Sequence, residues 1–226
     1  KTTASFISRL SDHKKKWLDN HRGTKYVRLG EIVEPKDMSV YDEAGYINDA
    51  EKTIIFYLEQ VLGNEIPENV TVLFENLWWP GLRLTDVRNV KYFFERIKRK
   101  NVGIMLDTGH LMNTNPRLKN EAEAADYVCR VIEKLGTTAE LIKGVHLSCS
   151  LSGQYQRSFV RCAPANLDNA LIWQHVASID QHAPFKTNAA RQILDFVKPE
   201  YVVHEFSYEN MDDLRAKLSV QLANSR

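Results

Sequence analysis

The sequence predicts an α/β protein built on a parallel β-sheet. Short runs of Val, Ile, Leu and Phe alternate along the chain with longer stretches that have helical apolar periodicity. This alternation is typical of consecutive β-α-β units, whose strands must run parallel. A second observation concerns the ends of these runs, where a metal-binding type of side chain follows four of them.

Five runs are expected to form strands, and they cover residues 26–29, 70–74, 102–106, 142–147 and 201–204. Helices are expected over residues 48–62, 86–100, 120–135, 167–179, 188–197 and 211–222. Asn48 can cap the first helix, and Gly63 and Gly136 follow two of them as typical terminators. The stretch between residues 148 and 165 has no clear pattern and is expected to be irregular. The length fits one domain over residues 1–226.

Charge argues against a nucleic-acid partner. The chain carries 30 basic and 29 acidic residues, a formal net charge of +1, whereas nucleic-acid-binding domains have a basic excess. Its two basic clusters, residues 14–16 and 96–100, fit solvated helix faces.

Cysteine usage and hydropathy predict a cytoplasmic protein without a membrane anchor. The three cysteines have no CxxC spacing, which favours reduced thiols over a disulfide framework. No apolar run approaches the roughly 20 residues that span a bilayer. Residues 1–9 lack the apolar centre of a signal peptide.

The ends of the later strands carry the main functional information. The strand over residues 70–74 is followed by Glu75, the next by Asp107, the third by His146 and the last by Glu205. In parallel α/β proteins active sites are built at this edge of the sheet. A single carboxylate here often only caps the next helix, but four such positions drawn from Asp, Glu and His are harder to explain in that way.

A divalent cation explains this set of side chains. Three carboxylates that converge without a cation would repel one another and raise their own pKa values. Carboxylates and imidazole without a thiolate suit Mn²⁺, Mg²⁺, Co²⁺ or Zn²⁺. No GxGxxG or phosphate-binding loop is present, so no organic cofactor is expected.

Four motifs resemble the xylose-isomerase-like barrels, which include sugar isomerases and epimerases, hydroxypyruvate isomerase and endonuclease IV. The matching segments are residues 73–76 (LFEN), 103–110 (GIMLDTGH), 144–147 (GVHL) and 203–206 (VHEF). The resemblance covers roughly residues 25–209. It implies a TIM (β/α)8 barrel that, with five strands counted, apparently lacks its first two or three β-α units in this chain. Exposed sheet edges would then need further residues or a partner chain, such as a homo-oligomer, to cover them.

The resemblance also implies roles for individual residues. Glu75, Asp107, His146 and Glu205 would bind one divalent ion, and the two glutamates would carry the substrate proton. His110 would contact a substrate oxygen, and Arg157 or Arg161 could help to hold the substrate.

Two further features have alternative interpretations. Trp78 and Trp79 could form an aromatic wall over a sugar, or could pack against a neighbouring loop or subunit. Asp180 and His182 match the Asp-x-His pair that helps to hold an additional zinc in endonuclease IV, but His182 before Ala-Pro also fits a simple turn.

The function implied is isomerisation or epimerisation of a sugar or sugar phosphate, in carbohydrate metabolism. The ion, with manganese among the candidates, would polarise a carbonyl and lower the cost of forming an enediolate. One glutamate would remove the carbon-bound proton while the other returns one. The alternatives are a metal-dependent phosphodiester hydrolase of the endonuclease IV type, and a barrel that has lost activity.

Overall fold

The computed structural model describes residues 66–78, 82–159 and 169–225, all within one compact unit over residues 39–226. The expected strand over residues 26–29 and helix over residues 48–62 lie outside the described residues, so both stay predictions. The single-domain boundary likewise stays a prediction.

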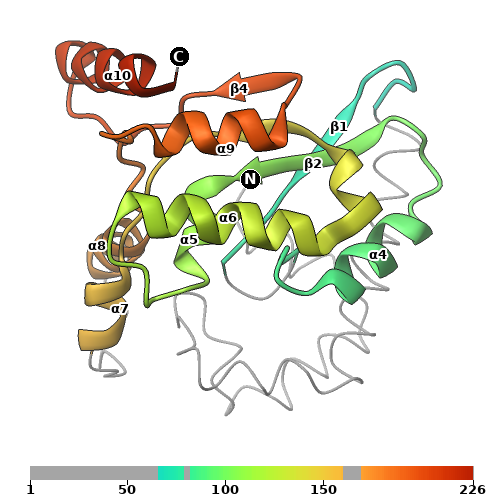
Figure 1. Ribbon diagram of the computed structural model, residues 1–226, viewed down its shortest axis with the longest axis horizontal. Coiled ribbons are helices and arrows are strands. Elements are labelled where there is room, and N and C mark those ends of the chain that lie inside the picture. Colours follow the sequence, from blue (N-terminus) through green and yellow to red (C-terminus); the bar gives the residue numbers. More distant parts are fainter. Residues whose placement is uncertain (1–65, 79–81, 160–168, 226) are drawn as a thin grey trace. The chain divides into compact units, whose positions relative to one another are not determined.

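Four parallel strands form the sheet of the described chain, in the order β1-β2-β3-β4 (Figure 1). They are β1 (Val72–Glu75), β2 (Val102–Asp107), β3 (Ile142–His146) and β4 (Tyr201–Val203). The register pairs Glu75 with Met105, Asp107 with His146, and His146 with Val203. The ends of β2, β3 and β4 are therefore level, while β1 ends two residues short of the end of β2, and all four ends lie at one edge of the sheet. The predicted parallel α/β architecture is confirmed, as a sheet that is not closed within the described residues.

Helices connect the strands. They are α4 (Val87–Arg96), α5 (Thr108–Asn113), α6 (Glu121–Leu135), α7 (Gly153–Ser158), α8 (Asn169–Ile179), α9 (Ala189–Val197) and α10 (Met211–Ser225), with a 3-10 helix η2 (Gly136–Leu141) after α6. Asp86 caps α4 by accepting hydrogen bonds from the main-chain N–H groups of Arg88 and Asn89. Gly136 ends α6 at a φ of 57°, a conformation that favours glycine.

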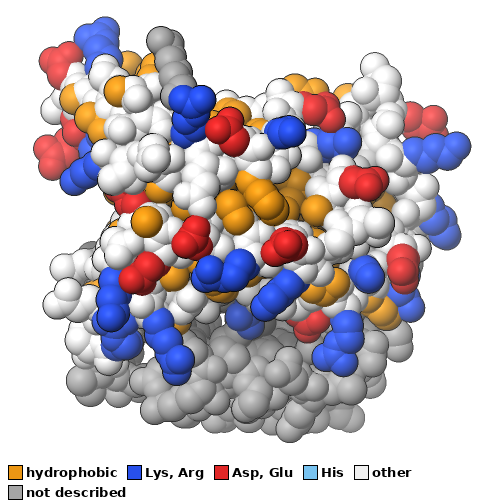
Figure 2. Space-filling model, in the orientation of Figure 1, with side chains coloured by type: hydrophobic (Ala, Val, Ile, Leu, Met, Phe, Trp, Pro, Cys, Tyr) orange, Lys and Arg blue, Asp and Glu red, His pale blue; other side chains and the backbone are white. Residues whose placement is uncertain are grey.

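The main core lies between the sheet and the paired helices α6 and α9 (Figure 1). Its fully buried side chains include Ile104, Leu106, Val128, Val145 and Ile193. Removing each such side chain from water contributes about 1.5–3 kcal/mol, so this apolar layer supports the sheet directly behind the strand ends. On the face in Figure 2, basic and acidic side chains are interspersed over the described residues.

Two differences from the expected elements have physical causes. Helix α4 ends at Arg96 instead of residue 100, because Ile97 adopts an extended conformation and is buried in a cluster that includes Val72 and Val102 of the strands. The prediction of irregular structure over residues 148–165 is wrong where α7 forms. The sequence of α7 has no apolar periodicity, and hydrogen bonds of Gln156 Nε2 hold it instead, a tertiary one to Asn113 O and a local one to Ser152 Oγ. No helix in the described ranges is long and apolar enough to cross a membrane.

Candidate metal centre

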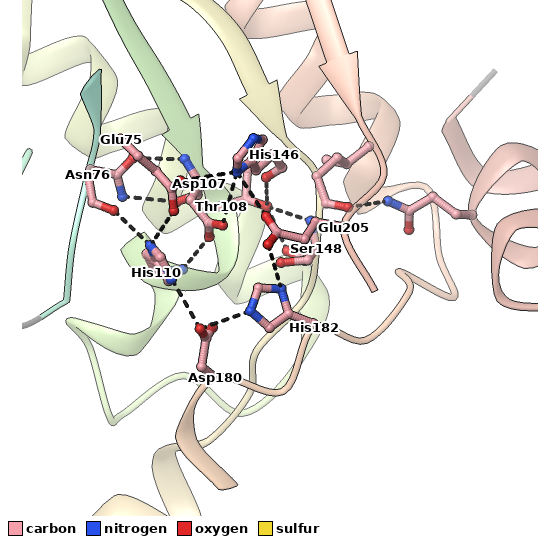
Figure 3. Close-up of polar contacts among 12 residues, drawn as sticks. Glu75, Asn76, Asp107, Thr108, His110, His146, Ser148, Asp180, His182 and Glu205 are labelled. Carbon is pink, nitrogen blue, oxygen red and sulfur yellow. Dashed lines mark hydrogen bonds and ion pairs between the residues drawn. The ribbon is translucent and has the colours of Figure 1, made fainter. Parts of the chain in front are cut away.

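The four predicted metal ligands come together at the C-terminal edge of the sheet (Figure 3). Glu75, Asp107 and His146 are the last residues of β1, β2 and β3, and Glu205 lies two residues beyond the end of β4. Because the strands are parallel, their C-terminal ends bring these side chains to the same edge of the sheet.

His146 Nδ1 is the point on which the carboxylates converge. It lies 2.8 Å from Glu205 Oε2, 3.4 Å from Glu75 Oε2 and 3.9 Å from Asp107 Oδ2. Candidate ligand atoms of Glu75, Asp107 and His146 all lie within 4.8 Å of one another, and so do those of Asp107, His182 and Glu205. Asp107 thus belongs to both sets. Whether one ion contacts all four predicted ligands stays a prediction.

The unpaired atoms at this edge fit a cation. Asp107 Oδ2, His146 Nδ1 and Glu205 Oε2 are buried and have no hydrogen bond of good geometry within the described chain, although Nδ1 lies within ion-pair distance of the carboxylates. Buried polar atoms are normally hydrogen-bonded, and several unpaired atoms facing one another need an explanation. Oxygen donors with imidazole are the set that Mn²⁺, Mg²⁺, Co²⁺ and Zn²⁺ accept. The residues present therefore fit a divalent ion.

Burial and neighbouring charge shift the pKa values of Asp107 and Glu75 in opposite directions. Burial, opposed by His110, raises the pKa of Asp107 to about 6. Glu75 is also partly buried, but hydrogen bonds from His110 and His146 outweigh that effect and lower its pKa to about 2. The pKa of His146 is raised, chiefly by its hydrogen bond to Glu75. Glu75 is therefore ionised at neutral pH, and the protons that a cation would displace are on its neighbours.

A second group of possible ligands adjoins the first and consists of His110, Asp180 and His182. Asp180 Oδ2 lies 3.1 Å from His110 Nε2 and 2.9 Å from His182 Nε2, and His182 has a φ of 44°. The Asp-x-His pair is thus directed at His110 rather than only forming a turn. This arrangement supports the interpretation of Asp180 and His182 as additional metal ligands, which stays a proposal.

His110 connects the two groups. Helix α5 places it beside Asp107, whose Oδ1 accepts a hydrogen bond of 2.6 Å from the His110 N–H. Its Nδ1 lies 3.0 Å from Glu75 Oε1, and its Nε2 faces Asp180. Although burial favours the neutral ring, the bonds to Asp180 and Glu75 raise the pKa of His110 to about 11. In the metal-free protein His110 is therefore a cation between two carboxylates.

Of the other predicted substrate-binding residues, Trp78 lies beside the site, Arg157 makes a contact elsewhere, and two are not described. Trp78 is buried and packs against His110, with 4.8 Å between ring centroids, so one side of the site has an aromatic wall. Arg157, on α7, donates from Nη1 to the main-chain oxygen of Pro116. Trp79 and Arg161 lie outside the described residues. The substrate-binding roles of all these residues stay predictions.

Two buried side chains that the sequence did not single out also join the strand ends. The Asn76 amide bonds the main chain of Asp107. Thr108 Oγ1 donates to Ser148 O at 2.6 Å and accepts from the Ser148 N–H. Both residues stand next to predicted ligands in the sequence, and that adjacency was the only indication of their importance.

Comparison with known families agrees with this geometry. A family model described as "Xylose isomerase-like TIM barrel" matches residues 21–212. The chain belongs to this family. Its members include isomerases, epimerases and endonuclease IV, and most are enzymes. Neither a search of curated proteins nor a search of solved structures gave a match.

Proposed function

We propose that this member of the xylose isomerase-like family is a divalent-metal-dependent isomerase or epimerase of a sugar or sugar phosphate. The observation that carries the proposal is the unequal exposure of three carboxylates around one imidazole. The Asp107 side chain is 0% exposed, whereas those of Glu75 and Glu205 are 35% and 41% exposed. Asp107, being fully buried, could bind the ion but could not contact a substrate, whereas the partly exposed Glu75 and Glu205 could do both.

Glu75, Asp107, His146 and Glu205 would hold the ion. When bound, it would supply Lewis-acid polarisation of a substrate carbonyl. Glu75 and Glu205 are both partly exposed, so a substrate could approach the centre from their side.

Glu75 and Glu205 would carry the proton. Glu75 reaches His146 Nδ1 from the end of β1 and Glu205 from beyond the end of β4, the two outer strands of the described sheet, so they approach the same point from different sides. One carboxylate would remove the proton from the substrate carbon, and the other would return one to the adjacent carbon or the opposite face. A base must be ionised, and the low pKa of Glu75 satisfies this requirement at neutral pH.

The surrounding residues would orient the substrate. Trp78 is buried against His110, so it would act by holding the His110 ring in place beside the substrate. The free thiols of Cys129 and Cys149 are consistent with a cytoplasmic enzyme.

Proton exchange tests this function. The protein, supplied with Mn²⁺, is incubated in deuterated water with a panel of ketoses and ketose phosphates. We expect loss of a carbon-bound proton signal by NMR for at least one compound, and no loss with Glu205→Gln. Efficient cleavage of abasic DNA, without exchange on any sugar, would overturn the proposal.

One observation favours a second candidate, a metal-dependent phosphodiester hydrolase. The group formed by His110, Asp180 and His182 directly adjoins the first ligand group, and hydrolysis of phosphodiesters often uses several ions. The near-zero net charge favours the isomerase instead, since DNA binding relies on basic contacts.

A further inference from the structure

Asn76 is a fully buried residue between the ends of β1 and β2. Its side-chain Nδ2 donates to Asp107 O at 3.0 Å, and its Oδ1 accepts from the Asp107 N–H at 2.8 Å. The β1–β2 ladder pairs Glu75 with Met105 as its last residues. The Asn76 amide therefore continues the pairing beyond the ladder and ties the residue after Glu75 to Asp107.

The main chain of Asn76 makes a third contact in the site. Its carbonyl oxygen lies 2.8 Å from His110 Nδ1 (Figure 3). Because a carbonyl can only accept, Nδ1 must carry a proton there. The other ring nitrogen, Nε2, is thereby directed toward Asp180.

The direction of the Asn76 side chain shows that it holds the main chain of Asp107 and does not itself point into the metal centre. Both ends of the Asn76 side chain face the main chain of Asp107, whereas the carboxylates of Glu75 and Asp107 face His146. An asparagine fits this place because it has one donor and one acceptor, as the Asp107 main chain requires.

We propose that Asn76 is a positioning residue of the metal centre, which fixes the separation of Glu75 and Asp107 and the orientation of His110. The inference rests on the proposed function, because it concerns the same metal centre. Partners behind a ligand typically change metal affinity by about 10- to 100-fold when removed.

Two substitutions separate this role from the alternatives. Asn76→Asp keeps the shape and the acceptor but replaces the donor with an oxygen that faces Asp107 O. Asn76→Ala removes both bonds. Asn113→Ala is the matched control, because Asn113 is also buried and its Oδ1 accepts a bond from Ser152, which holds no predicted ligand.

Calorimetric titration with Mn²⁺, below the melting temperature of each variant, is the measurement. We expect Asn76→Asp and Asn76→Ala to bind Mn²⁺ about tenfold or more weakly, and Asn113→Ala to bind within about twofold of the unsubstituted protein. If Asn76 were itself a ligand, Asn76→Asp would bind as tightly or more tightly. If it were only structural, its variants would lose thermal stability but keep their Mn²⁺ affinity. Either result overturns the inference.

A measurement on the metal-free protein distinguishes failure of this inference from failure of the proposed function. Should the unsubstituted protein bind no Mn²⁺, the proposed function fails, and NMR of the metal-free protein then decides the role of Asn76. The Asp107 main-chain N–H signal and the His110 ring signals are expected to shift in both Asn76 variants and to stay in place in Asn113→Ala. Unchanged signals in Asn76→Asp overturn the inference. If Asn76→Ala does not fold, the isosteric Asn76→Asp carries both measurements.

Discussion

Glu75 Oε1 lies 3.0 Å from His110 Nδ1, and this contact joins the two groups of possible metal ligands. Glu75 belongs to the group with Asp107 and His146, and His110 to the group with Asp180 and His182. The Glu75 carboxylate therefore interacts with positive charge in both groups, because it contacts His146 in one and His110 in the other. In the metal-free protein the protonated His110 ring supplies that charge.

Asp107→Asn should weaken Mn²⁺ binding by about tenfold or more, because it removes charge from a fully buried predicted ligand that can act together with Glu75 and His146 and also with His182 and Glu205. Proton-exchange activity should recover in part at high Mn²⁺ concentration, since the substitution leaves both glutamates in place. Calorimetry and a Mn²⁺ titration of turnover provide the measurements. Asp195→Asn is the control, because Asp195 is exposed and pairs with Arg191 on the same helix, α9. An unchanged Mn²⁺ affinity in Asp107→Asn would exclude Asp107 as a ligand.

Glu205→Gln and Glu75→Gln should act mainly on turnover. Each retains an oxygen donor but loses the basic carboxylate, so Mn²⁺ affinity should fall modestly while kcat falls by about 10² to 10⁴. The measurement is kcat at saturating Mn²⁺ for the ketose identified by proton exchange. Near-normal turnover of Glu205→Gln would require the two-glutamate mechanism to be abandoned, even with metal binding intact.

The sequence predicted the sheet and the convergence of the ligands because both follow from local patterns. Strands β2 and β3 are short apolar runs, and parallel pairing then forces Asp107 and His146 to the same edge. The ends of the helices were less predictable. Ile97 adopts an extended conformation where α4 ends, and the cluster that buries it includes Val72 and Val102 from other segments, contacts that helical periodicity does not encode.

Contacts between distant segments could not be read from the sequence. His110 and Asp180 are 70 positions apart, and the Asp-x-His pair follows directly on the end of α8 at Ile179. The positive φ of His182 turns its ring back toward Asp180, and no local pattern predicts that turn. The hydrogen bonds of Asn76 and Thr108 are similar cases, because a buried polar side chain is specified by the partner it meets.

Metal affinity should depend on pH. A divalent ion must displace the proton of His146, whose pKa is raised, and that of Asp107, whose pKa is about 6. These protons are bound below the respective pKa values, so affinity should fall as pH decreases, starting above the ordinary histidine value and steepening below about pH 6. Each proton displaced contributes about a tenfold loss per pH unit. Glu75, with a pKa of about 2, should contribute nothing in this range. Calorimetry with Mn²⁺ between pH 5.5 and about pH 8 tests this, and a pH-independent affinity would contradict it.

The second ligand group predicts a second ion. With Zn²⁺ in excess we expect two ions per chain by elemental analysis after desalting, and one ion in His182→Ala or Asp180→Asn. The physical reason is that Asp180 Oδ2 lies within 3.1 Å of both His110 Nε2 and His182 Nε2. One ion bound by these three atoms could replace the protons that the two hydrogen bonds share. Proton exchange on the sugar should persist in these variants, because Glu75 and Glu205 are untouched. His175→Ala is the control, since His175 bonds Tyr155 and contacts neither group. A different result would identify the hydrolase: cleavage of abasic DNA by the Zn²⁺-loaded protein, abolished by His182→Ala, would assign the second ion to phosphodiester chemistry.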